Sequence, residues 1–109
     1  MPQKEGFKES RRSTRVELKV TIEVQGQELR CKGETVIVNL HGALINVTAP
    51  LEVGMRILLF VFITGKQSYA RVVSVPTPLQ CGIELDKPHN IWGVSLAPED
   101  WQQSTSSDF

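Results

Sequence analysis

The sequence predicts an all-β domain, a six-stranded antiparallel β-barrel with a short helical turn near its C-terminus. Apolar and polar residues alternate in several segments, turn signals separate these segments, and helical periodicity is almost absent. A chain of 109 residues has the size of one domain. At this size, closure into a barrel avoids exposed strand edges. We assign residues 11–102 to the barrel and expect flexible tails at 1–10 and 103–109.

The first predicted strand is half-buried and ends at Gly26. Its apolar residues occupy every second position: Val16, Leu18, Val20, Ile22 and Val24. A period of two places these side chains on one face of a strand, whereas no helix would gather them on one side.

The next two strands, at 35–40 and 43–48, are predicted to form a tight hairpin. His41-Gly42 between them fits a two-residue turn, in which Gly supplies the positive φ. The resulting register pairs apolar residues on one face: Leu40 with Ala43, Val38 with Ile45, and Val36 with Val47. A slip of one residue would move every side chain to the opposite face.

Three further strands complete the predicted barrel. Residues 55–64 are apolar on both faces, which predicts cover by the core on one side and by the C-terminal segment or a second subunit on the other. The next strand, 67–75, ends at the prolines that follow it, and alternation resumes over 79–85. A helical turn is expected near Pro98, because Pro and acidic residues are favoured in a first turn.

The composition predicts a cytoplasmic protein without a strong overall charge. Twelve basic residues balance twelve acidic ones, so no global field favours nucleic acid or an anionic membrane. The longest apolar run, 57–63, is far shorter than the roughly 20 residues of a membrane-spanning helix, and the first ten residues are polar. Cys31 and Cys81 show no metal-ligand spacing and are expected to be buried free thiols.

Enzyme chemistry is not predicted. The two histidines, His41 and His89, have no Cys or carboxylate at the spacing of a metal site or a catalytic triad. The sequence has no glycine-rich phosphate loop. We therefore expect a binding module that has no metal or cofactor and no nucleic-acid partner, and that does not insert into a membrane.

One basic cluster is the candidate binding element. Arg11, Arg12 and Arg15 lie directly before the first predicted strand. Their guanidinium groups can donate paired hydrogen bonds to phosphate oxygens and can stack on purine rings. A solvated basic surface is the alternative interpretation of such a run.

The spacing of Arg11 and Arg15 before an alternating strand resembles the PilZ domain family. Three later segments are also similar to that family: CGIEL at 81–85, NIWG at 90–93 and PEDW at 98–101. The resemblance covers about residues 9–102 and implies a barrel that receives the bacterial second messenger cyclic di-GMP. In the family, these arginines hold the phosphates and guanines. A second motif, Asp/Asn-x-Ser-x-x-Gly, completes the site from the turn between the second and third strands.

The second motif departs from the family pattern here. Counted forward from Asn39, it puts His41 at the Ser position and Leu44 at the Gly position. Counted back from Gly42, it puts Asn39 at the Ser position and Ile37 at the Asp/Asn position. We interpret the turn as shortened by two residues, which would remove ligand contacts and limit cyclic di-GMP affinity to micromolar or weaker.

The resemblance gives a candidate ligand site of six residues: Arg11, Arg12, Arg15, Asn39, His41 and Gly42. The alternative is a PilZ-like adaptor that binds no nucleotide and contacts an unknown protein partner, or a second copy of the chain in a homodimer. Such an adaptor would use the apolar strand at 55–64 or the surface near Trp92 and Trp101.

Overall fold

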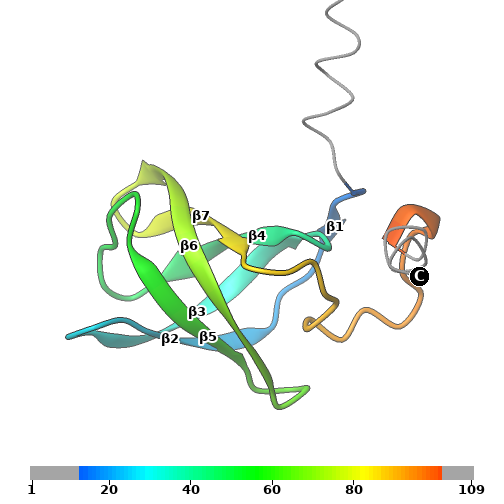
Figure 1. Cartoon of the computed structure of the whole chain (residues 1–109), viewed down its shortest axis with the longest axis horizontal. Helices are drawn as coiled ribbons and strands as arrows, with labels where there is room; N and C mark the ends of the chain where they lie inside the picture. The colour runs from blue at the N-terminus through cyan, green and yellow to red at the C-terminus, as the bar shows by residue number, and fades with distance from the viewer. Residues whose placement is uncertain (1–12, 102–109) are drawn as a thin grey trace, which may run out of the picture.

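Seven antiparallel strands make up the part of the chain that the computed structural model describes, residues 13–101 (Figure 1). The strands are β1 (Val16–Glu17), β2 (Thr21–Gln25), β3 (Arg30–Val38), β4 (Gly42–Val47), β5 (Arg56–Val61), β6 (Lys66–Thr77) and β7 (Gln80–Leu85). Strands β2 to β7 close into a six-stranded barrel in the order β3-β2-β5-β6-β7-β4, because β4 pairs back with β3. The predicted fold class is thus confirmed. β1 lies outside this ring and pairs with β3.

The barrel interior is filled by the alternating apolar residues that the sequence pattern indicates. Fully buried side chains come from every strand of the ring: Ile22, Val24, Val38, Ile45, Leu59, Val61, Ala70, Val72, Ile83 and Leu85. Closure pairs both edges of the sheet, so the ring presents no free edge to another chain.

The predicted first strand is interrupted at residues 18–20, between β1 and β2. The cause is Thr35, whose side chain is buried at 2% exposure. Its hydroxyl accepts a hydrogen bond from the Val20 N–H at 3.0 Å and donates one to the Leu18 carbonyl. The register of β3 shifts between Thr35 and Ile37, so Thr35 faces the interior and Val36 is only half-buried.

Replacing Thr35 with Val is expected to lower the free energy of unfolding by about 2–4 kcal/mol. Val keeps the shape of the side chain, but it leaves two backbone groups without a partner, at about 1–3 kcal/mol each. Urea unfolding measures the change. Thr35→Ser keeps the hydroxyl and should lose no more than about 1 kcal/mol, the value of one buried methyl group. Equal losses in the two variants would contradict this role for the hydroxyl.

The hairpin between β3 and β4 has a longer connection than the sequence predicted. Val38 pairs with Ala43, so residues 39–42 connect the paired strands. All three predicted pairings are wrong: Val47 pairs with Gly33, Ile45 with Thr35, and Ala43 with Val38.

Asn39 is the physical reason for this longer turn. Its Oδ1 accepts hydrogen bonds from the N–H groups of His41 and Gly42, both at 2.8 Å. Its own N–H donates to the Gly42 carbonyl at 2.9 Å. An Asn side chain that accepts these hydrogen bonds takes the place of a backbone carbonyl in closing the turn. Gly42 has a negative φ, so the turn does not need Gly for the backbone conformation that we expected.

Within residues 13–101, β5 is fully covered on its inner face and only partly covered on its outer face. Its inward side chains Ile57, Leu59 and Val61 are buried in the core. On the outer face Phe60 is half-buried, and Phe62, just after the strand, is 46% exposed. We predicted cover of this face by the C-terminal segment or a second subunit, and within residues 13–101 Phe62 stays exposed. β6 also differs from its prediction, because it continues through Pro76 to Thr77.

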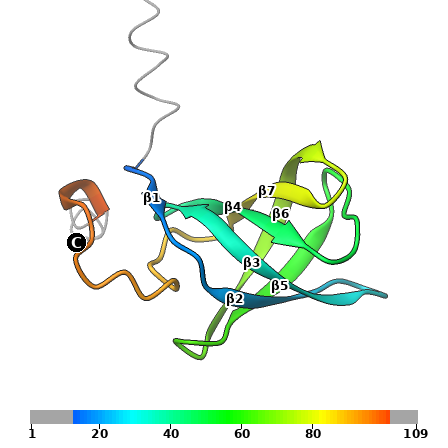
Figure 2. The same cartoon turned by 180° about the vertical axis from the view of Figure 1, so that it is seen from behind.

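After β7, the chain crosses the end of the barrel beside β1 (Figure 2). Trp92 and Trp101 from this segment are each 1% exposed. The predicted helical turn is present at residues 99–101, and the Trp101 N–H donates to the Pro98 carbonyl at 3.1 Å. No helix within residues 13–101 is both long and apolar enough to span a membrane.

Both cysteines are buried and free, as the sequence predicts. Burial, together with the neighbouring Cys31 thiol, raises the pKa of Cys81 to about 11. The Cys81 thiol is therefore neutral at physiological pH and is a weak nucleophile. Residues 13–101 contain no group of three His, Cys, Asp or Glu side chains that could hold a metal ion.

Candidate ligand-binding groove

A groove of about 570 Å³ lies on the outside of the barrel over β3, β4 and β7, next to the start of β1. Four of the six predicted site residues line it: Arg15, Asn39, His41 and Gly42. Arg11 and Arg12, the other two predicted residues, lie outside the described residues. The fold thus brings Arg15 to the β3–β4 turn, although Arg15 and Asn39 are 24 positions apart in the sequence.

The strand pairings place four groove residues, and Arg71 outside its lining, in one row across the strands. Asn39 bonds Gly42, Gly42 pairs with Glu84, and Glu84 pairs with Arg71. Arg15 lies at the other end of this row, because the next residue of β1 pairs with the residue before Asn39. We call these five residues the polar row. It begins and ends with an arginine, and a carboxylate lies near one end.

An apolar row runs beside the polar row on the same outer face. Ile37 pairs with Leu44, and Leu44 pairs with Gly82. Val73 of β6 also lines the groove and is 47% exposed. We call Ile37, Leu44, Gly82 and Val73 the apolar row. A flat, partly apolar molecule such as a purine base can lie against this surface, with its polar groups toward the polar row.

The two glycines keep the floor of the groove at backbone level. A Cβ at Gly42 would lie 2.0 Å from the Ile83 carbonyl oxygen, and a Cβ at Gly82 would lie 2.6 Å from Ser74 Oγ. Without side chains at these positions, β4 and β6 can approach β7 closely at the floor of the groove.

The chain just before β1 is fixed by the two residues that separate Arg12 from Arg15. Ser13 Oγ accepts a hydrogen bond from the Leu40 N–H at 3.1 Å and lies 3.3 Å from His41 Nδ1. The N–H and the hydroxyl of Thr14 both donate to Asp100 Oδ2, at 2.8 and 2.9 Å. Arg15 is therefore held at the groove by its neighbours, while its own side chain is exposed to solvent.

Two tryptophans of the C-terminal segment donate hydrogen bonds to the backbone of the segments beside the groove. The Trp92 indole N–H donates to the Asn39 carbonyl at 2.9 Å. The Trp101 indole N–H donates to the Thr14 carbonyl at 2.8 Å. Each indole thus anchors one part of the site, the β3–β4 turn or the chain before β1. Because both side chains are buried, they support the groove and do not offer a surface to a partner.

Sequence reasoning missed Ser13, Thr14 and Asp100. Small hydroxyl residues between arginines are a weak signal, since Ser and Thr hydroxyls commonly bond nearby backbone groups. Nothing in the local sequence indicates that Thr14 would meet Asp100, 86 residues later.

The length of the β3–β4 turn also changes the interpretation of the second motif. The register differs from that of the two-residue His41-Gly42 hairpin from which we inferred a deletion, because Val38 pairs with Ala43. The count back from Gly42 spans the end of β3 and the connection from Asn39 to Gly42. In that alignment, Asn39 stands at the Ser position and Ile37 at the Asp/Asn position, and both residues line the groove.

The groove combines hydrogen-bonding groups, one exposed guanidinium group and a flat apolar surface. This set suits the binding of an anionic, partly planar ligand. Comparison with family models, curated proteins and solved structures finds no match to this chain.

Proposed function

We propose that this chain is a PilZ-like module that binds cyclic di-GMP in the groove, with micromolar or weaker affinity. One observation carries the proposal: the fold gathers Arg15, Asn39, His41 and Gly42 around one groove of about 570 Å³. Its volume lies in the range of small-molecule sites, roughly 300–1,000 Å³. The ligand offers phosphates for Arg15 and flat bases for the apolar row.

The expected weakness of binding follows from two residues. The Asn39 Oδ1 is used by the turn, because it already accepts hydrogen bonds from two backbone N–H groups. Ile37 presents an aliphatic side chain where the family motif has Asp or Asn. Each ligand polar group that loses a partner in this way weakens binding by about 1–3 kcal/mol.

Calorimetric titration of the full chain with cyclic di-GMP tests the proposal. We expect saturable binding in the micromolar range or above, and Arg15→Ala should weaken it at least tenfold. Because the Arg15 side chain is exposed, this variant should unfold at nearly the same temperature as the parent.

Arg30→Ala is the matched control for the titration. Arg30 is also an exposed arginine of the barrel, but it bonds Glu23 at 3.3 Å and does not line the groove. It should leave the affinity unchanged. Absence of saturable binding, or equal losses in the two arginine variants, would overturn the proposal.

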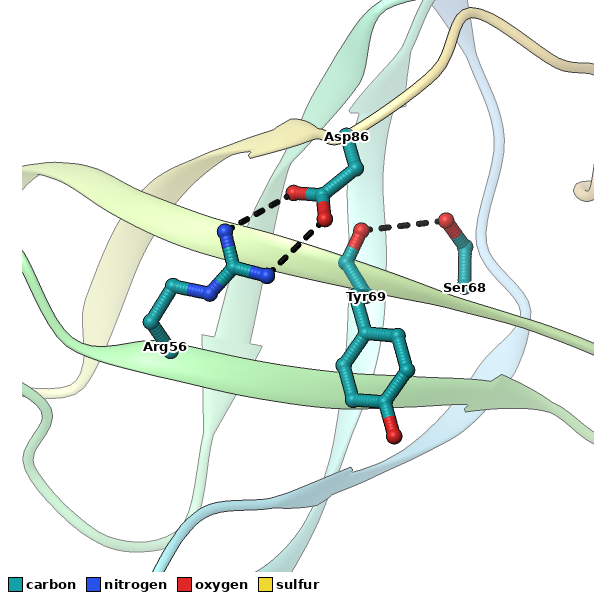
Figure 3. Close-up of polar contacts among 4 residues, drawn as sticks. All are labelled: Arg56, Ser68, Tyr69 and Asp86. Atoms are coloured by element: carbon teal, nitrogen blue, oxygen red, sulfur yellow. Dashed lines mark hydrogen bonds and ion pairs between the residues drawn. The ribbon is translucent and has the colours of Figure 1, made fainter.

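A second candidate function, a protein-interaction adaptor without nucleotide binding, is favoured by a different surface. The outer face of β5 and β6 carries Phe60 and Phe62 in an edge-to-face pair with ring centroids 5.0 Å apart. Tyr69 on this face is 59% exposed. It lies beside Arg56, which donates two hydrogen bonds to Asp86 at 3.1 and 2.9 Å (Figure 3).

Contiguous exposed apolar surface can mark a contact with another molecule. Sedimentation over a wide range of protein concentration tests whether a second copy of the chain covers it. A monomer at every concentration would exclude the homodimer, and tight cyclic di-GMP binding would exclude an adaptor that binds no nucleotide.

A further inference from the structure

The C-terminal turn bonds every polar group of Thr14, the residue directly before Arg15. Asp100 Oδ2 accepts hydrogen bonds from the Thr14 N–H at 2.8 Å and from the Thr14 hydroxyl at 2.9 Å. The Trp101 indole N–H donates to the Thr14 carbonyl at 2.8 Å. The C-terminal turn and the start of β1 lie side by side at one end of the barrel (Figure 2). We call Thr14, Asp100 and Trp101 the clasp.

The backbone at Arg15 depends on the clasp for its position. On one side of Arg15, β1 has only two residues, both paired with β3. On the other side, the buried Ser13 hydroxyl accepts a hydrogen bond from the Leu40 N–H at 3.1 Å. Because Thr14 lies between Ser13 and Arg15, the clasp sets how far Arg15 can move from the groove that it lines.

The Asp100 carboxylate uses only one of its oxygens in the clasp. The second oxygen, Oδ1, is buried and has no hydrogen-bond partner within residues 13–101. A buried acceptor without a partner is rare in native proteins and is unfavourable. Opening of the clasp would expose Oδ1 to water, which offsets part of the loss of the two Thr14 hydrogen bonds. The clasp is therefore a contact that can open locally, and a ligand that binds only the closed form would favour closure.

We propose that Asp100 is a positioning residue for Arg15, and that the clasp couples ligand binding in the groove to closure of the C-terminal turn. This inference rests on the proposed function, because it takes Arg15 as the contact for the ligand phosphate. Asp100 does not line the groove, so it acts through Thr14. Because coupling is reciprocal, a closed clasp raises the affinity for the ligand, and a bound ligand keeps the clasp closed.

Calorimetric titration of Asp100→Ala with cyclic di-GMP tests the inference. We expect about tenfold weaker binding than in the parent chain, because the ligand must then order Thr14 and Arg15 when it binds. The sign separates positioning from charge, since removal of a negative charge alone would favour an anionic ligand. Glu99→Ala is the matched control, because Glu99 is the adjacent, exposed carboxylate of the same turn. It should bind cyclic di-GMP at least as tightly as the parent.

Asp100→Asn tests the hydrogen bonds themselves. An Asn side chain keeps one acceptor oxygen for both Thr14 donors, so this variant should recover most of the affinity that Asp100→Ala loses. Parental or tighter binding by Asp100→Ala would overturn the inference, as would an equal loss in Glu99→Ala or in Asp100→Asn. Thermal unfolding shows whether each barrel is intact.

The parent chain provides a measurement of the coupling that needs no variant. Exchange of the Trp101 indole hydrogen with solvent, followed by NMR, should slow when cyclic di-GMP is bound, because the closed clasp holds that hydrogen in its bond to Thr14. Unchanged exchange in the saturated complex would overturn the inference and leave the proposed function standing.

NMR relaxation of the Arg15 backbone amide, measured without ligand, separates the two possible failures. If cyclic di-GMP does not bind the parent chain, the proposed function fails, and this measurement decides the role of Asp100. We expect a lower order parameter at Arg15 in Asp100→Ala than in the parent and in Glu99→Ala. The same order parameter in all three chains would overturn the inference.

Discussion

Gly42→Ala is expected to lower the free energy of unfolding by about 3 kcal/mol, at the upper end of overpacking effects. The added Cβ would lie 2.0 Å from the Ile83 carbonyl oxygen, 3.0 Å from the Ile83 carbonyl carbon and 3.2 Å from the Glu84 Cα. All three atoms belong to the backbone of β7, so no change of side-chain rotamer can relieve the contact. The paired strands β4 and β7 must move apart. Because this pairing helps to close the barrel, the loss affects the whole domain.

Urea unfolding measures the effect, with Gly26→Ala as the matched control. A Cβ at Gly26 would have its nearest neighbour 3.7 Å away, which is ordinary van der Waals contact, and its φ is not positive. That variant should change the free energy of unfolding by less than about 1 kcal/mol. Loss of cooperative unfolding in Gly42→Ala would count as a larger effect of the same sign. Similar stabilities of the two variants would show that β7 yields easily at Ile83.

The period-two pattern was sufficient to predict the buried faces of β2 and β7, but not the bounds of β3, which begins at Arg30 and not at residue 35. Ile22 and Val24 are buried as the alternation indicates, because the charged Glu23 between them cannot enter the core without a large desolvation cost. The pattern fails at Thr35, since Thr fits either face of a strand. A single hydroxyl that bonds both Leu18 and Val20 decides that the first strand breaks and that β3 bulges. Alternation carries no information about such a side-chain bond.

The turn shows a different limit of sequence reasoning. His41-Gly42 between two apolar segments favours a two-residue hairpin, but an Asn side chain can also close a turn with backbone N–H groups two and three residues later. Asn39 does so, and the Trp92 indole holds its carbonyl. That last contact joins residues 53 positions apart and depends on the folded C-terminal segment.

Residues of the candidate site that belong to a sequence motif could be predicted, whereas residues that only tertiary contacts bring to the site could not. Arg15, Asn39, His41 and Gly42 were identified from a family resemblance, and they line one groove. Glu84 was not identified, because an acidic residue on an alternating strand is usually a solvated residue. Only the register that pairs it with Gly42 places it in the groove.

The double variant Ile37→Asn/Asn39→Ser is expected to bind cyclic di-GMP about a hundredfold more tightly than the parent, a gain of about 2.7 kcal/mol. With Gly42, these two changes produce Asn-x-Ser-x-x-Gly over residues 37–42 without any insertion. The connection between Val38 and Ala43 keeps its four residues in this variant. The new amide replaces an aliphatic side chain in the groove, and the new hydroxyl can still close the turn. Two recovered ligand contacts at about 1–3 kcal/mol each account for the gain.

The matched control, His41→Ser/Leu44→Gly, produces the same motif in the other alignment, counted forward from Asn39. We expect it to gain no affinity, because it removes Leu44 from the apolar row and leaves Ile37 in place. Calorimetric titration of both variants with cyclic di-GMP compares the two alignments directly, and thermal unfolding confirms that each barrel is folded. A gain in the control alone would assign the motif to residues 39–44. No gain in either variant would show that Ile37 and Asn39 do not limit binding, and that the weakness of the native site arises at Arg15 and the chain before it.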